Sequence, residues 1–141
     1  MTRKLILNLS LLLFVIFFAS GCINRATAIK NPTTDLSTIK SLYVTKYAPD
    51  RRGINKLIAD KLEKRGFIVE TGVDTPSNVD AVVTYKDKWM WDITMYMIEL
   101  NIAIRNPKTN FPFASGNSYH TSLTRKSPEE MVDEVINNIF K

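Results

Sequence analysis

The sequence predicts a single α/β (α+β) domain, in which one sheet of mixed direction carries two helices packed on one face. Three observations lead to this prediction. A strand, an amphipathic helix and a second strand follow one another between residues 39 and 70, three further strand-like segments come next, and a second amphipathic helix closes the chain. The predicted order is β-α-β-β-β-β-α, and a sheet with helices on one face buries the apolar side of every element.

The first unit is predicted from its periodicity. Ile39 to Lys46 alternates and is rich in β-branched and aromatic residues, as strands are. The helix follows from apolar residues at i, i+3, i+4 and i+8, namely Ile54, Leu57, Ile58 and Leu62. Gly66 follows a basic last turn and would end the helix. Phe67 to Glu70 is the second strand, so we expect a βαβ unit with parallel strands and a right-handed crossover.

The second half of the chain is predicted to be antiparallel. Its strands are Val79 to Lys88, Thr94 to Arg105, and Pro112 to Leu123. Strict alternation in the middle strand would place Tyr96, Ile98, Leu100, Ile102 and Ile104 on one face, and Met95 and Met97 on the other.

The closing helix is predicted from its start signal and its apolar stripe. Ser127-Pro128-Glu129-Glu130 is a capping box with proline at the first helical position. The stripe consists of Met131, Val132, Val135, Ile136 and Ile139.

Residues 1–21 have the layout of a secretory signal peptide. Arg3 and Lys4 precede an apolar run from Leu5 to Phe18, and small residues follow it. The run is shorter than the ~20 residues that a membrane-spanning helix needs. A permanent transmembrane anchor is therefore the weaker alternative.

Phe18-Ala19-Ser20-Gly21-Cys22 resembles the lipobox of bacterial lipoproteins. The resemblance implies that Cys22 receives a diacylglycerol, that cleavage precedes it, and that its new amine is acylated, for example with palmitate. Ala19 departs from the pattern, since leucine is commonest there. The alternative is a chance cysteine beside an ordinary cleavage site.

Cys22 is the only cysteine, and an unpaired thiol outside the cytoplasm is prone to oxidation, which acylation prevents. Two or more acyl chains give stable anchoring. Ile23 follows the cysteine, and the aspartate that favours inner-membrane retention in such lipoproteins is absent. The resemblance therefore implies the periplasmic face of the outer membrane in a Gram-negative cell.

The remaining organisation is a lipidated tether at 22–37 and a single α/β domain at 38–141. The tether is predicted because Ile23 to Ser37 is polar, shows little apolar periodicity and contains Pro32. The element order behind a lipobox resembles small envelope lipoproteins of uncharacterised type, whose sheet-and-two-helix domain also occurs in curli-secretion and polysaccharide-export lipoproteins.

Composition argues against nucleic acid as a partner. The formal net charge is +5, and removal of Arg3 and Lys4 with the signal peptide would reduce it by two. A nucleic-acid-binding domain usually carries a stronger basic excess.

No constellation for catalysis or metal binding is evident in the sequence. His120 is the only histidine and Ser118 lies two residues before it, but no orienting acid or nucleophile elbow accompanies them. Zinc would need three or four suitable ligands. We therefore expect no enzymatic activity, no metal and no cofactor.

The segment Lys88 to Met97, KWMWDITMYM, is the most unusual local feature. Trp89 and Trp91 would point the same way on a continued strand, and Asp92 would mark a turn. The two indoles could pack in the core or form a recognition surface, and both alternatives remain open. The second alternative arises because exposed aromatic residues are favoured at protein interfaces, on sugar rings and at membrane boundaries. Arg51 and Arg52 lie in a loop without a helix dipole to explain them, so they join the candidate interaction surface.

The sequence thus predicts a lipid-anchored, non-enzymatic envelope protein that acts as a subunit or accessory of an envelope assembly or export complex. The expected partners are the membrane, through the acyl chains on Cys22, and another envelope protein. The alternative is a glycan- or lipid-binding module that uses the Trp89/Trp91 region. The oligomeric state is left open.

Overall fold

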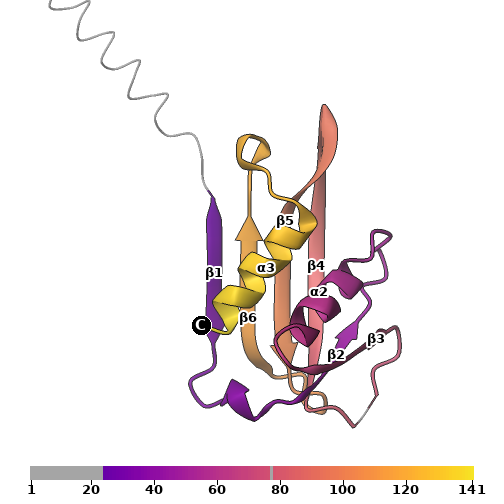
Figure 1. The fold of residues 1–141 in the computed structure, drawn as a ribbon, viewed down its shortest axis with the longest axis vertical. Coiled ribbons are helices and arrows are strands. Elements are labelled where there is room, and N and C mark those ends of the chain that lie inside the picture. Colours follow the sequence, from indigo (N-terminus) through magenta and orange to yellow (C-terminus); the bar gives the residue numbers. More distant parts are fainter. Residues whose placement is uncertain (1–23, 77) are drawn as a thin grey trace, which may run out of the picture.

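The computed structural model describes residues 24–76 and 78–141 (Figure 1). The predicted signal peptide and Cys22 lie outside these residues. In chain order the elements are β1 (Arg25–Lys30), the 3₁₀ turn η1 (Leu36–Thr38), β2 (Ser41–Thr45), α2 (Ile54–Glu63), β3 (Ile68–Gly72), β4 (Ala81–Asp92), β5 (Thr94–Arg105), β6 (Pro112–Tyr119), the 3₁₀ turn η2 (Ser122–Thr124) and α3 (Pro128–Ile139).

The strands form one mixed sheet in the order β1-β6-β5-β4-β2-β3. β2 pairs in parallel with both β3 and β4, as the βαβ prediction required for β3, and the other pairings are antiparallel. Both helices pack on the same face of the sheet (Figure 1). The predicted fold class is confirmed.

The two predicted apolar stripes form most of the helix side of the core. Ile54, Ile58 and Leu62 of α2 are buried, and Leu57 is partly buried against the same cluster. All five stripe residues of α3 are buried. The capping box is formed as predicted, because the Ser127 hydroxyl accepts from the N–H of Glu130 and the Glu130 carboxylate accepts from the N–H of Ser127.

Gly116 of β6 lets α3 approach the sheet closely. A Cβ atom at this position would lie 2.8 Å from Val135 Cγ1 and 3.1 Å from Ile139 Cγ1. A larger residue would push α3 off β6, so the absence of a side chain here sets the spacing of the two layers.

The prediction of a tether at 22–37 is wrong where the structure describes it, because residues 25–30 form the edge strand β1. The strand pairs antiparallel with β6, from Arg25 opposite Tyr119 to Lys30 opposite Ala114. Its side chains are almost all exposed. An edge strand that is held by main-chain hydrogen bonds does not need alternating apolar and polar side chains. The sequence of this segment therefore carries no strand pattern.

A β-bulge corrects the predicted faces of β5. The register shifts from Lys88 opposite Glu99 to Trp89 opposite Met97, which leaves Ile98 without a counterpart. Beyond a bulge, each side chain points to the opposite face of the sheet from the one that strict alternation would give it. Met97 therefore packs in the core with Leu100, and Tyr96 lies outside that core cluster.

None of the helices within residues 24–76 and 78–141 is long and apolar enough to cross a membrane.

Candidate interaction site

A basic cleft opens between the loop after β2, the start of α2 and strand β4. It has a volume of about 720 Å³ and is open to solvent. Its lining includes Lys46, Arg51, Arg52, Lys56, Thr71 and Trp89. The cleft lies at the carboxyl end of parallel strand β2 and the amino end of α2, which is where open α/β sheets commonly bind ligands.

Asp50 holds the loop that carries the two arginines. Its Oδ1 accepts from the N–H of Arg52 at 2.7 Å and of Gly53 at 3.0 Å. Its Oδ2 accepts from the Tyr85 hydroxyl at 2.6 Å and from the N–H of Asn55 at 3.3 Å. Because Gly53 has a φ of 73°, the loop can turn sharply into α2.

The titration behaviour of this pair agrees with a structural role. Burial alone would raise the pKa of Asp50, but the hydrogen bonds from Tyr85 and the three N–H groups outweigh it and lower the pKa below its ordinary value. Burial and the bond to Asp50 raise the pKa of Tyr85. The ionised carboxylate therefore fixes the main chain of the loop that carries Arg51 and Arg52.

Arg52 and Trp89, two of the predicted surface residues, meet in the cleft. The Arg52 guanidinium lies over the Trp89 ring, 4.1 Å from its centroid. The indole Nε1 donates to Asp87 Oδ2 at 2.5 Å, and Trp89 packs partly against the core. Since one ring face is already covered by Arg52, Trp89 is not a free stacking platform for a sugar.

The cations of the cleft have no ion-pair partner among the described residues. The described residues form four ion pairs, and none of these includes Lys46, Arg51, Arg52 or Lys56. Two carboxylates also line the cleft. Asp50 is buried and saturated with donors, whereas Glu129 is exposed, so the four cations outnumber the exposed acid. The cleft therefore presents positive charge to solvent.

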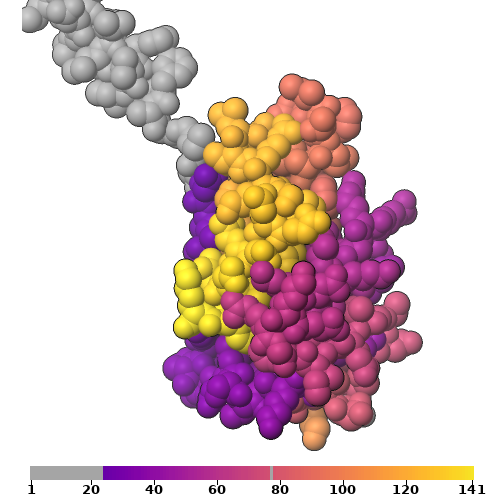
Figure 2. Space-filling view, viewed as in Figure 1, coloured from indigo at the N-terminus to yellow at the C-terminus, as the bar shows by residue number. Residues whose placement is uncertain are grey.

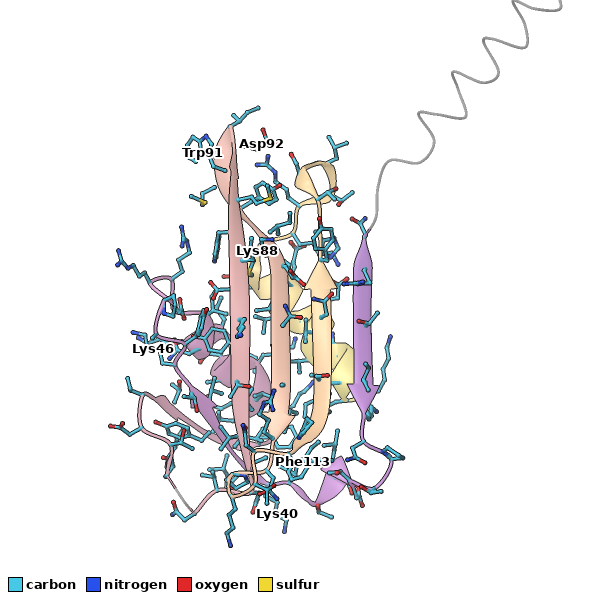
Figure 3. The ribbon with its side chains drawn as sticks, turned by 180° about the vertical axis from the view of Figure 1, so that it is seen from behind. Lys40, Lys46, Lys88, Trp91, Asp92 and Phe113 are labelled. Atoms are coloured by element: carbon cyan, nitrogen blue, oxygen red, sulfur yellow. The ribbon has the colours of Figure 1, made fainter. Side chains whose placement is uncertain are left out.

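Trp91 and Asp92 lie elsewhere, at the outer end of the β4–β5 hairpin (Figure 3). Trp91 is 70% exposed. Asp92 accepts a hydrogen bond from the Ser122 hydroxyl and pairs with the Arg125 guanidinium at 3.1 Å. The structure therefore divides the predicted surface into two parts, the basic cleft and the hairpin tip.

Glu134 completes a buried polar cluster that the sequence analysis missed. Its Oε2 accepts from Ser118 Oγ at 2.6 Å and lies 2.7 Å from His120 Nε2, and its Oε1 accepts from Lys126 Nζ at 2.6 Å. Only the contact of α3 with β6 brings Glu134 next to residues so distant in sequence, and no sequence signal marked it. Burial would raise the pKa of Glu134, but the three donors outweigh it and lower the pKa to about 2.

The geometry of this cluster differs from that of a nucleophilic triad. In a triad the histidine lies between the hydroxyl and the acid. Here the carboxylate lies between Ser118 and His120, so the hydroxyl donates to the acid and has no base. The cluster ties the end of β6 to α3.

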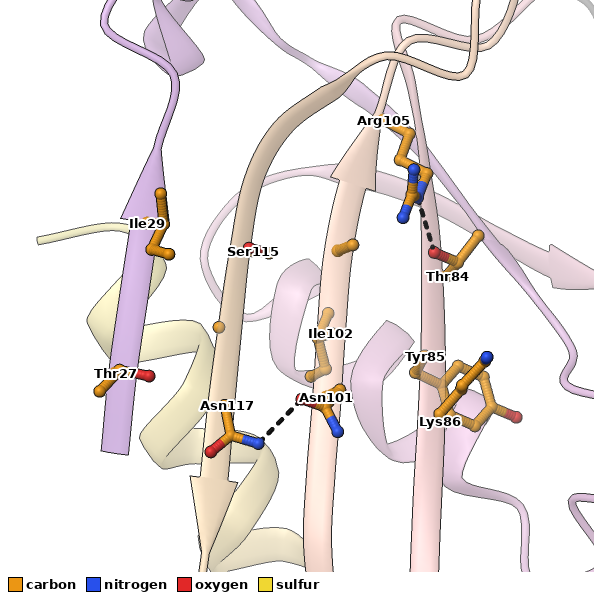
Figure 4. A pocket seen from close by; sticks show the side chains of 12 residues that line it. Thr27, Ile29, Thr84, Tyr85, Lys86, Asn101, Ile102, Arg105, Ser115 and Asn117 are labelled. Atoms are coloured by element: carbon orange, nitrogen blue, oxygen red, sulfur yellow. Dashed lines mark hydrogen bonds between the residues drawn. The ribbon is translucent and has the colours of Figure 1, made fainter. Parts of the chain in front are cut away.

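The sheet face opposite the helices carries an open pocket of about 380 Å³, lined by polar and apolar residues (Figure 4). Two pairs of its side chains bond to each other across neighbouring strands. Asn117 Nδ2 donates to Asn101 Oδ1 at 2.8 Å, and Arg105 Nε donates to Thr84 Oγ1 at 3.3 Å. These bonds between neighbouring strands stabilise the sheet without converging on a single point.

In the part of the chain that the structure describes, no three of the histidine, cysteine and acidic side chains are grouped so that they could hold a metal ion.

Comparisons with known proteins identify the fold. No protein-family model matches the chain, and no curated protein matches it. Among solved structures, the PelC dodecamer from Paraburkholderia phytofirmans is similar with a TM-score of 0.56 at 12% identity, covering 84% of this chain and 95% of that one. A PDZ domain protein from Parabacteroides distasonis has a TM-score of 0.52 at 11% identity, covering 76% of this chain and 32% of that one. At these identities the likeness shows a shared fold.

Proposed function

We propose that the chain is a lipid-anchored, non-enzymatic protein of the bacterial cell envelope, and that it is a subunit or accessory of an envelope assembly or export complex. The basic cleft is the observation that carries this proposal. The lipobox-like sequence at Cys22 supports the anchor. The fold shared with a subunit of a dodecamer, over most of both chains, supports a role in an assembly.

The cleft suits an acidic segment of a protein partner. Four cations surround it without ion-pair partners among the described residues. Asp50 fixes the main chain of the loop that carries Arg51 and Arg52, and Trp89 orders the Arg52 side chain. A preorganised cationic surface loses little side-chain entropy when a carboxylate docks. Guanidinium groups also recognise carboxylates with two parallel hydrogen bonds.

The geometry of the buried cluster of Ser118, His120 and Glu134 is the basis for proposing that the protein is not an enzyme. His120 Nε2 faces an ionised carboxylate, and Ser118 donates to that same oxygen. Neither group has a free partner with which to activate a nucleophile. These residues are better explained as a structural link between β6 and α3.

Acylation of Cys22 would confine the domain to the membrane surface and raise its effective concentration near partners there. The proposed location is the periplasmic face of the outer membrane. Intact-mass measurement of the mature protein tests the anchor directly, and a free thiol at Cys22 would contradict it.

Photocrosslinking in living cells tests the contact surface. A probe placed in turn at Arg51 and Lys56 is expected to yield a discrete protein adduct, whereas a probe at Lys108, in the exposed turn at the other end of the sheet, is not. An adduct with a second copy of the chain would make it a homo-oligomer. If neither cleft position forms a protein adduct while Cys22 is acylated, the assembly role at this surface is wrong.

The alternative is an acidic glycan as the ligand of the cleft. A saturable change in Trp89 fluorescence on titration with an acidic polysaccharide, together with the absence of protein adducts, would favour it. The stacking of Arg52 on Trp89 makes that indole a reporter for the cleft.

A further inference from the structure

An exposed apolar cluster occupies one end of the molecule. Trp91 and Ile93 form the tip of the β4–β5 hairpin, with Ile93 87% exposed, and Met90 and Met95 beside them are also exposed. Leu123 of η2, 84% exposed, lies next to this tip, because its neighbour Ser122 donates a hydrogen bond to Asp92. We call Met90, Trp91, Ile93, Met95 and Leu123 the apical cluster.

The apical cluster lies at the end where the chain enters the domain. The side chain of Thr124 in η2 donates a hydrogen bond to Asn24, the first described residue. Figures 1 and 2 show the hairpin tip, η2 and the start of β1 at the same end of the molecule. Cys22 precedes Asn24 by two residues, so the two Cα atoms are no more than about 7 Å apart.

We infer that the apical cluster inserts into the interface of the lipid bilayer that the acyl chains on Cys22 enter. This inference rests on the proposed lipid anchor. Acyl chains attached so close to Asn24 would hold this end of the domain against the membrane. Tryptophan is favoured at the boundary between headgroups and hydrocarbon, where its ring is buried and its N–H stays hydrated.

The charge of the tip is neutralised within the protein, which lowers the cost of bringing it to the membrane. The Arg125 guanidinium donates to Thr94 Oγ1 at 2.7 Å, to the main-chain oxygen of Asp92 at 2.9 Å and to its carboxylate at 3.1 Å. It also lies over the Tyr96 ring, 4.3 Å from the centroid. The carboxylate therefore does not enter the interface as an isolated charge.

Two exposed cations flank the tip. Arg25 begins β1 beside Asn24, and Lys88 lies three residues before Trp91 on β4. Neither has an ion-pair partner among residues 24–76 and 78–141. Cations beside an apolar tip attract the anionic headgroups of a bilayer.

The backbone of the tip adds an independent observation. Ile93 has a φ of 59°, a left-handed conformation that β-branched residues rarely adopt. Glycine or asparagine would relieve this strain, yet the position carries a large exposed apolar side chain. Strain at an exposed site is consistent with a functional demand for the isoleucine.

The test uses the full chain, acylated in cells and reconstituted into phosphatidylethanolamine and phosphatidylglycerol vesicles that contain a brominated phosphatidylcholine. Trp89→Phe leaves Trp91 as the only indole, and Trp91→Phe leaves Trp89. We expect the bromolipid to quench Trp91 and not Trp89, with a blue shift of Trp91 emission. Circular dichroism confirms folding of each variant.

A carboxylate introduced at the tip is compared with one introduced at an exposed position away from it. In the Trp89→Phe background, Ile93→Asp is expected to abolish the quenching of Trp91, whereas Ile29→Asp, at an equally apolar exposed position on β1 away from the tip, is expected to preserve it. Trp91 that remains open to iodide in the vesicles would overturn the inference. So would shielding of Trp91 from iodide without bromolipid quenching, which would indicate a protein contact.

Intact mass separates this inference from the proposed anchor. A free thiol on Cys22 would refute the anchor, whatever Trp91 does. Bromolipid quenching of Trp91 in such a protein would still support insertion of the tip, and its absence would overturn it.

Discussion

Replacement of Glu134 by glutamine should destabilise the protein at neutral pH. The folded-state pKa of Glu134 is about 2, against an ordinary value of 4.5. At about 1.36 kcal/mol per pKa unit, this difference corresponds to roughly 3 kcal/mol. Because the Lys126 side chain is 35% exposed, solvent screening reduces that figure. We expect Glu134→Gln to lower the free energy of unfolding by about 1–3 kcal/mol at pH 7.

The pH dependence has a definite sign. A carboxylate whose pKa is lowered on folding stabilises the protein above its unfolded pKa, and this contribution is lost as the pH falls through the folded value. Urea unfolding curves of the wild type and Glu134→Gln should therefore converge between pH 4.5 and about 2. Glu129→Gln, on the first turn of the same helix, is the matched control. A constant difference down to pH 2, or a difference at pH 7 no larger than that of the control, would refute the reasoning.

Three further substitutions test the packing of α3, the basic cleft and the apical cluster in turn. Gly116→Ala should cost about 1–3 kcal/mol by overpacking against Val135, measured by urea unfolding, and a neutral result would contradict the close packing of α3. Asp50→Ala leaves four donors without their acceptor and should lower the free energy of unfolding by about 1–3 kcal/mol. Trp89 emission should also change as the cleft loosens. Unchanged emission would show that Asp50 does not hold Arg52 in place. Ile93→Asn relieves the left-handed strain and should raise stability by about 0.5–1 kcal/mol, and a loss of stability would argue against strain at the apex.

The two surfaces suggest a consistent orientation on a membrane. Figure 3 shows Trp91 at the outer end of the hairpin and Lys46 of the basic cleft well away from that end. The apical cluster lies at the end that receives the chain from Cys22, whereas the cleft lies beside the start of α2. A domain held by its tip would leave the cleft accessible from the aqueous side. The proposed lipid and protein contacts would then not compete.

The sequence by itself determined the elements that have a strong local signal. Helix α2 spans the predicted apolar stripe from Ile54 to Leu62, strand β5 has the predicted bounds, and α3 begins with the predicted capping box. Helical and strand periodicity and the capping box are properties of neighbouring residues, so they can be read without a fold. The prediction for Cys22 also rests on a local pattern, and it remains a prediction.

Tertiary structure alone decided the rest, because those features depend on contacts between distant segments. β1 is a strand only because β6 offers it main-chain partners, and the bulge at Ile98 reverses a face that the alternation had assigned. Glu134 joins His120 through the packing of α3 on the sheet. The separation of Trp89 from Trp91 has the same origin, since Trp89 packs partly against the core and under Arg52, whereas Trp91 is exposed at the end of the hairpin.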